Sequence, residues 1–225
     1  MSNERQNIPG LQIKRFGDRK NPTKLVQGII QLSSWDGYYL DEDFYKKKIK
    51  RVTDGQITLS VDAEITRDEK INCDPEQVNT YWYLVEQQEH VKQQILQALV
   101  NDFPSLLEED YKSYDIEEGG FPPLSDIVSG FDFKNYIGPN TISIGEEFKD
   151  DAAYVTWYFN CRWDPEHGFQ VVTHNDRIID IAQDADPWKV SKDNGTYTEE
   201  MAQRSKNAGP EPFAWKKKKW WQFWK

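Results

Sequence analysis

Apolar residues recur every three or four positions between residues 75 and 100, and this spacing predicts one long amphipathic helix. Asp74 can cap the first exposed amides, Pro75 suits the first turn, and Gln77 completes a capping box. The pair Phe103-Pro104 predicts where the helix ends. The apolar positions that share its buried face are Val78, Tyr81, Trp82, Val85, Ile95, Leu96 and Leu99.

A period of two predicts β-strands on both sides of this helix. Before the helix, residues 24–32 and 57–63 are rich in strand-forming residues, and each segment adjoins a turn that contains glycine. After the helix, the strand-like segments are residues 141–144, 153–163, 169–173 and 178–181. The pair Asn175-Asp176 between the last two segments predicts a tight turn, so the second half of the chain is expected to be an antiparallel meander.

Strands on both sides of one long helix indicate an α+β fold, in which an antiparallel sheet carries the helix on one face. A length of 225 residues suits a single core. We therefore predict a lead-in over residues 1–22, one α+β domain over residues 23–184, a linker over residues 185–212, and a basic aromatic tail over residues 213–225. The N- and C-terminal tails are expected to be flexible.

Acidic residues dominate the chain outside its last thirteen residues. Residues 1–212 carry 23 basic and 38 acidic groups, a formal charge of −15, whereas residues 213–225 carry five lysines and no acid. Such a surface repels phosphate groups and attracts basic proteins, and it also promotes solubility. We therefore expect a protein partner and no nucleic acid.

An acidic stretch from residue 108 to residue 132 is broken by glycine and proline pairs, which predicts a loop with one short helix over residues 124–128. Its carboxylates are the candidates for contact with a basic partner. The residues selected as candidate partner-binding groups are Glu108, Glu109, Glu117 and Glu118.

The end of the chain combines lysines with aromatic residues, a composition typical of a membrane-interface anchor. Ten residues are too few to span a bilayer. Contact with a membrane surface, docking onto the acidic body, and binding to another protein all remain open, whereas the acidic body disfavours stacking on single-stranded nucleic acid. The candidate residues are Lys216, Lys217, Lys218, Lys219, Trp220, Trp221, Phe223 and Trp224.

An acidic and imidazole-containing corner lies between two predicted strands. Asp164, Glu166 and His167, with His174 one strand away, are residue types that bind divalent metals or act in acid–base catalysis. The same residues also suit a turn, because Asp164 can accept backbone hydrogen bonds and Gly168 tolerates a positive φ. The turn is the favoured interpretation, so we predict no metal site, and the catalytic role stays an alternative.

Cysteine content and hydropathy point to an intracellular chain. Cys73 and Cys161 are far apart in sequence, which argues against a disulfide framework or a zinc ribbon and predicts two free thiols. No apolar run is long enough for a membrane span, and the first residues lack the apolar centre of a signal peptide. We expect a cytoplasmic protein without a cofactor, with the tail allowing peripheral contact at the inner membrane.

The stretch Cys161-Arg162-Trp163-Asp164-Pro165-Glu166-His167-Gly168, followed by Asn175-Asp176-Arg177-Ile178-Ile179, resembles a family of uncharacterised bacterial domains. Those domains share a Trp-Asp-x-Glu-His-Gly corner near the C-terminal end of an α+β fold, and Trp35-Asp36-Gly37 also fits. The resemblance covers residues 26–185. One departure is Phe169-Gln170, where Leu-Gly is expected. The resemblance implies an acidic immunity or accessory protein and no known activity.

These features favour a non-enzymatic, acidic protein-binding domain, of the immunity or accessory type, with a lysine- and tryptophan-rich tail. Two alternatives remain. One is a peripheral membrane adaptor that attaches through residues 213–225. The other is a metal-dependent hydrolase that uses Asp164, Glu166 and His167.

Overall fold

The structure of the 225-residue chain is a computed structural model that describes residues 6–18, 22–43, 49–109, 127 and 130–198. Its helices are α1 (Pro75–Glu86), α2 (Gln88–Glu109) and α3 (Pro187–Asp193), with short 3-10 helices η2 (Ser33–Trp35) and η4 (Phe133–Asn135). Its strands are β1 (Gln12–Phe16), β2 (Thr23–Gln31), β3 (Tyr39–Asp43), β4 (Ile49–Val52), β5 (Gln56–Val61), β6 (Glu64–Ile65), β7 (Ile71–Asn72), β8 (Ile137–Lys149), β9 (Ala152–Cys161), β10 (Phe169–His174) and β11 (Arg177–Ala182).

A seven-stranded sheet in the order β1-β2-β5-β8-β9-β10-β11 organises the described chain. All neighbouring strands run antiparallel except β5 and β8, which are parallel. A parallel pair needs a crossover connection, and α1 and α2 lie in that connection. The predicted α+β class is confirmed, and the sheet is mostly rather than wholly antiparallel.

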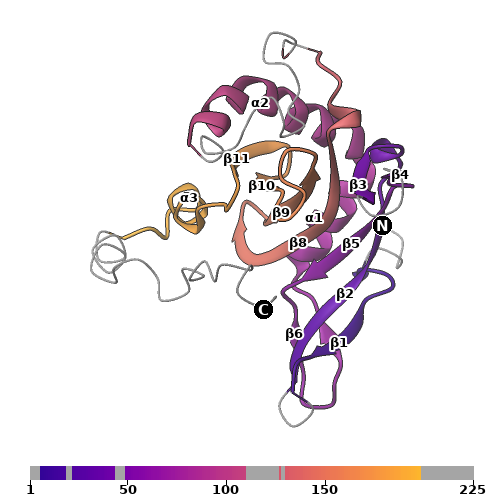
Figure 1. Ribbon diagram of the computed structural model, residues 1–225. Helices are drawn as coiled ribbons and strands as arrows, with labels where there is room; N and C mark the ends of the chain where they lie inside the picture. The colour runs from indigo at the N-terminus through magenta and orange to yellow at the C-terminus, as the bar shows by residue number, and fades with distance from the viewer. Residues whose placement is uncertain (1–5, 19–21, 44–48, 110–126, 128–129, 199–225) are drawn as a thin grey trace, which may run out of the picture.

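Helices α1 and α2 cover one face of the sheet (Figure 1): α1 contacts β8 and β9, and α2 contacts β11. Alternate strand residues on this face are buried, as period-two patterning requires. Aromatic rings fill much of the core. The ring centroids of Trp35 and Phe159 lie 5.4 Å apart, and the Phe159 ring stacks on Phe169 with 5.0 Å between centroids. The ring centroids of Trp163 and Phe103 lie 5.3 Å apart. These rings join the sheet, η2 and α2 into one core.

The prediction of one helix over residues 75–100 that ends at Phe103-Pro104 was wrong in two respects. The helix is interrupted at Gln87, which caps the end of α1, and α2 continues through Pro104 to Glu109. Proline inside a helix costs about 3 kcal/mol. The side chains of Phe103 and Leu106 are 0% and 4% exposed, and burial of each contributes about 1.5–3 kcal/mol, which offsets that cost.

The strands predicted over residues 24–32, 57–63, 141–144, 153–163, 169–173 and 178–181 correspond to β2, β5, β8, β9, β10 and β11. The predicted lead-in, residues 1–22, contains β1, which pairs with β2 along its whole length. The predicted linker, residues 185–212, contains α3, which contacts β11. The short helix predicted over residues 124–128 falls almost entirely outside the described residues.

Candidate functional site

The corner between β9 and β10 is held by hydrogen bonds within the turn. Asp164 is 2% exposed, its Oδ1 accepts from the His167 backbone N–H at 3.1 Å, and its Oδ2 accepts from the Gln183 amide at 2.8 Å. Gly168 has φ +68°, and a Cβ there would lie 2.0 Å from the carbonyl oxygen of Phe159. Asp164 therefore caps the turn, and position 168 requires glycine.

Asp164 and His167 are in contact, with Nδ1 of the imidazole 3.1 Å from Oδ1 of the carboxylate, but the other acid and imidazole groups of this region do not join them. Glu166 is exposed and the His167 side chain is 62% exposed. His174 lies at the opposite end of β10, is buried, and donates from Nε2 to the Lys149 carbonyl oxygen at 2.7 Å. Within the part of the chain that the structure describes, no three His, Cys, Asp or Glu side chains are arranged to hold a metal ion.

The face of the sheet opposite α1 and α2, here called the open face, carries mostly hydroxyl and amide side chains. Strand register aligns two rows of side chains across it. One row is Gln27, Ser60, Ser143, Thr156, Val172 and Asp180, and the other is Ile29, Thr58, Thr141, Tyr158, Gln170 and Ala182. Antiparallel sheets often leave one face polar, so the rows alone define a surface and not a site.

A cleft of about 220 Å³ lies on the open face, between the sheet and the start of α3. Its floor includes Ser143, Thr156 and Tyr158, and its wall includes Pro187 and Val190 of the α3 region. Hydroxyl groups can both donate and accept hydrogen bonds. The floor therefore suits a polar, extended ligand such as a peptide backbone.

Asp62 and Glu147 line this cleft, and together with Glu146, whose charge also acts on Asp62, they form the group of carboxylates here called the acidic rim. The register of β8 against β9 shifts between Ile144 and Phe148, so Glu146 and Glu147 lie in a bulge. Partial burial raises the pKa of Asp62, and repulsion from Glu146 and then Glu147 raises it further. Both glutamates therefore lie close enough to Asp62 to repel its charge.

Gln77 of α1 holds the backbone on both sides of the acidic rim. Its fully buried side-chain amide donates to the carbonyl oxygens of Asp62 and Gly145, each at 3.0 Å. Its Oε1 accepts from the Asp74 backbone N–H at 3.0 Å, which completes the predicted capping box. One side chain thus links the start of α1 to the end of β5 and to the bulge of β8.

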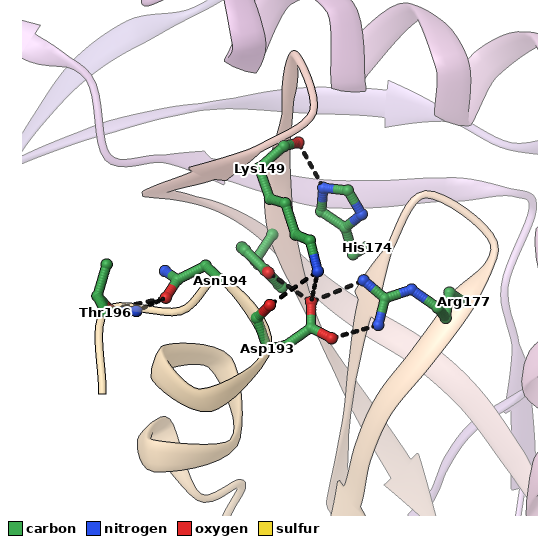
Figure 2. Close-up of polar contacts among 7 residues, drawn as sticks. Lys149, His174, Arg177, Asp193, Asn194 and Thr196 are labelled. Atoms are coloured by element: carbon green, nitrogen blue, oxygen red, sulfur yellow. Dashed lines mark hydrogen bonds and ion pairs between the residues drawn. The ribbon is translucent and has the colours of Figure 1, made fainter. Parts of the chain in front are cut away.

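Helix α3 is attached to the open face through Asp193, its last residue. Figure 2 shows Lys149 and Arg177 converging on this carboxylate. Arg177 donates from both Nη atoms, with Nη2 at 2.6 Å from Oδ2, and the Tyr154 hydroxyl donates at 2.6 Å. These contacts hold the pKa of Asp193 well below its usual range, with Arg177 as the largest cause.

The other end of α3 is held by Asp180 of β11. This buried carboxylate accepts from the Asp186 backbone N–H at 2.8 Å and forms an ion pair with Lys189. No residue of α3 is itself buried. Polar contacts at both ends, rather than apolar burial, therefore position α3 beside the cleft.

The two tyrosines at the cleft act as hydrogen-bonding groups. Burial and the bond to Asp193 raise the pKa of Tyr154, while burial and the charge of Asp62 raise the pKa of Tyr158. Both phenols stay protonated at neutral pH and are not activated as nucleophiles. The arrangement offers carboxylate acceptors beside neutral hydroxyl groups, which suits the binding of cationic and amide groups.

The candidate residues outside this face are only partly described. Glu108 and Glu109 form the last turn of α2, but their side chains lie outside the described residues, as do Glu117 and Glu118. The tail candidates from Lys216 to Trp224 also lie outside them. Among the described helices, none has the length and apolarity needed to cross a bilayer. Cys161 is buried and Cys73 is half-buried, and both are free.

The residues that build the cleft were not predicted from the sequence. Asp62 lies at the end of a predicted strand, and Asp193 lies in the predicted linker. Two signals are visible in retrospect. Gly145-Glu146-Glu147 interrupts an alternating strand, and Asp186-Pro187 repeats the Asp-Pro helix start seen at the beginning of α1.

Comparison with known proteins places the chain in a family without assigning a function. The model of a family described as "Domain of unknown function (DUF6985)" matches residues 33–186, more than half of the chain. No curated protein and no solved structure matches. The predicted resemblance to an uncharacterised domain family is confirmed, while the bacterial origin and the corner motif stay predictions. This chain belongs to the DUF6985 family.

Proposed function

We propose that this chain is a non-enzymatic, acidic protein-binding domain whose cleft receives a basic, extended segment of a protein partner. The observation that carries the proposal is the placement of Asp62 and Glu147 in the lining of the cleft, beside the hydroxyl groups of its floor. Partial burial, and then repulsion from Glu146 and Glu147, raises the pKa of Asp62, which agrees with carboxylates that lie close together. A lysine or arginine placed at this rim relieves that repulsion. In the free domain, Glu146 and Glu147 repel the charge of Asp62, and a basic ligand would remove this repulsion on binding.

The floor of the cleft supports the choice of an extended peptide segment. Ser143 and Thr156 face one another across β8 and β9, beside Tyr158 and Gln170. Their side chains can hydrogen-bond a peptide backbone without reading its sequence. The acidic rim would then select a segment with a basic residue at one end.

The acidic rim is tested by removing its charge from the full chain. The probe is a fluorescent decapeptide of alternating lysine and serine, and binding is followed by fluorescence anisotropy at low and moderate salt. The triple variant Asp62→Asn, Glu146→Gln, Glu147→Gln should weaken binding about tenfold at low salt, because exposed ion pairs contribute modestly and are screened by salt.

A matched control removes three exposed charges from the helix side of the domain: Asp36→Asn, Glu86→Gln and Asp102→Asn. Both variants have the same net charge, so they separate local recognition from the overall field. Binding of the control should stay within about twofold of the unaltered chain. Equal weakening by both variants would refute a site at the acidic rim.

A further inference from the structure

We propose that the basic aromatic tail of this chain, residues 216–225, docks on its own open face and competes there with the protein partner. The inference rests on the proposed function, because the tail would occupy the surface assigned to that partner. Its lysines would lie at the acidic rim formed by Asp62, Glu146 and Glu147, and its indole rings would cover apolar side chains of the same face.

Charge complementarity is the first argument. The tail carries five lysines and no acid, whereas the rest of the chain has a formal charge of −15. Partial burial, and then the charges of Glu146 and Glu147, raises the pKa of Asp62, and no positive group is among the causes of that shift. A run of four lysines is therefore a suitable occupant.

Apolar complementarity on the same face is the second argument. Ile29 is 53% exposed, while Leu25 and Tyr158 are each 40% exposed. Ile29 and Tyr158 belong to one cross-strand row, and Leu25 alternates with the buried Val26 on β2, so all three point to the open face. Tryptophan rings can cover such side chains, and a lysine can lie over the Tyr158 ring.

The connection is long enough for docking within one molecule. The described chain ends at Thr198, five residues after α3, and seventeen residues separate it from Lys216. A segment of that length spans at most roughly 60 Å. Seven strands measure roughly 30 Å across the sheet. The tail can therefore reach both the acidic rim and the row that contains Tyr158.

The starting point of the connection favours docking in cis over capture of a separate molecule. The polar contacts of Asp193 fix the end of α3 beside the cleft, so the chain leaves the folded domain at the edge of this surface. A tethered ligand has an effective concentration in the millimolar range. A tail that binds only weakly as a free peptide would still occupy the open face for much of the time.

Paramagnetic relaxation measured by NMR on the full chain tests this arrangement. A spin label is attached to Lys225→Cys in a Cys73→Ser background, where the buried Cys161 stays unmodified. We expect loss of amide signals from residues 25–29, 58–62 and 141–147, with signals from residues 95–103 of α2 retained. No signal loss, or uniform loss over both faces, would overturn the inference.

A charge variant provides the matched control. Replacing Lys216, Lys217, Lys218 and Lys219 by glutamine in the labelled chain should restore the open-face signals. In the unlabelled chain the same change should strengthen binding of the Lys-Ser decapeptide by about threefold or more, because competition is removed. Weaker decapeptide binding would mean that the tail helps to bind the ligand. It would contradict the inference that the tail competes with the partner for the open face.

Two outcomes separate this inference from the proposed function. Decapeptide binding that depends on the acidic rim, without relaxation from the tail, overturns only the docking of the tail. Relaxation without any decapeptide binding leaves the tail docked and overturns the partner site. Co-sedimentation with phosphatidylglycerol vesicles, combined with no relaxation in their absence, would show that the tail binds lipid and not the open face.

Discussion

The side-chain Nε2 of Gln77 donates a 3.0 Å hydrogen bond to the backbone carbonyl oxygen of Asp62. The first residue belongs to the start of α1, and the second follows the end of β5. A second hydrogen bond, to the backbone carbonyl oxygen of Gly145, holds the neighbouring strand β8 at the start of its bulge. The helix thereby helps to hold Asp62 near the glutamates of the bulge, whose charges add to the effect of partial burial in raising the pKa of Asp62.

Replacing Gln77 with methionine should destabilise the domain. Gln77→Met removes three hydrogen bonds at a fully buried position and leaves the Asp62 and Gly145 carbonyl oxygens without this donor. We expect a loss of about 2–4 kcal/mol in the free energy of unfolding, measured by chemical denaturation. Gln94→Met on the exposed side of α2 is the control, and a similar loss there would contradict the assignment.

The contact between Arg177 and Asp193 should determine whether α3 stays on the sheet. Asp193→Asn removes the charge that the bidentate guanidinium and the Lys149 ammonium share. Amide exchange within α3 should become about 3–10-fold faster, because Arg177 is half-exposed and the pair is partly screened. Asp184→Asn is the exposed control. Unchanged exchange in Asp193→Asn would mean that other contacts hold α3.

The same pair predicts an acid-sensitive contribution to stability. The pKa of Asp193 is lowered in the folded chain from an ordinary value of 3.8, so the unfolded state binds the proton more readily. The contribution is fully present above that ordinary value and is lost as the pH falls through the folded value. The stability difference between the unaltered chain and Asp193→Asn should therefore shrink below about pH 4 in denaturation series.

The turn between β9 and β10 should tolerate no side chain at position 168. Gly168→Ala combines a positive φ with a Cβ 2.0 Å from the Phe159 carbonyl oxygen, so a loss of about 3 kcal/mol or more is expected. Gly195→Ala is the matched control, since it also has a positive φ but nothing within 4 Å of the added Cβ. Its loss should be only about 1 kcal/mol. Equal losses of stability in the two variants would contradict a steric clash at position 168.

Local patterns in the sequence predicted much of the fold. Alternation identified six strands of the main sheet, and the Asp74-Pro75-x-Gln77 start identified α1. The continuation of α2 through Pro104 was missed because burial of Phe103 and Leu106 outweighs a local helix breaker. The parallel pairing of β5 and β8 was also missed, since the path of the crossover is set by packing and not by periodicity.

The candidate site was harder to predict, because its residues come from separate segments. Asp62, Glu147 and Asp186 are far apart in sequence and line one cleft because of strand register, a bulge and the position of α3. Asp164 was a candidate catalytic residue because an acid and an imidazole follow it closely in the sequence. In the structure its carboxylate caps a turn. Sequence proximity identified the corner, whereas three-dimensional proximity identified the cleft.

Amide chemical-shift mapping on the full chain tests the central claim most directly. The Lys-Ser decapeptide is titrated into labelled protein, and shifts are followed for every assigned residue. A binding site in the cleft predicts saturable shifts at residues 60–62, 143–147, 154–158 and 186–190, all of which shrink in the triple variant of the acidic rim. Shifts that gather on α2 or around His167, or that persist unchanged in that variant, would contradict binding at the open face.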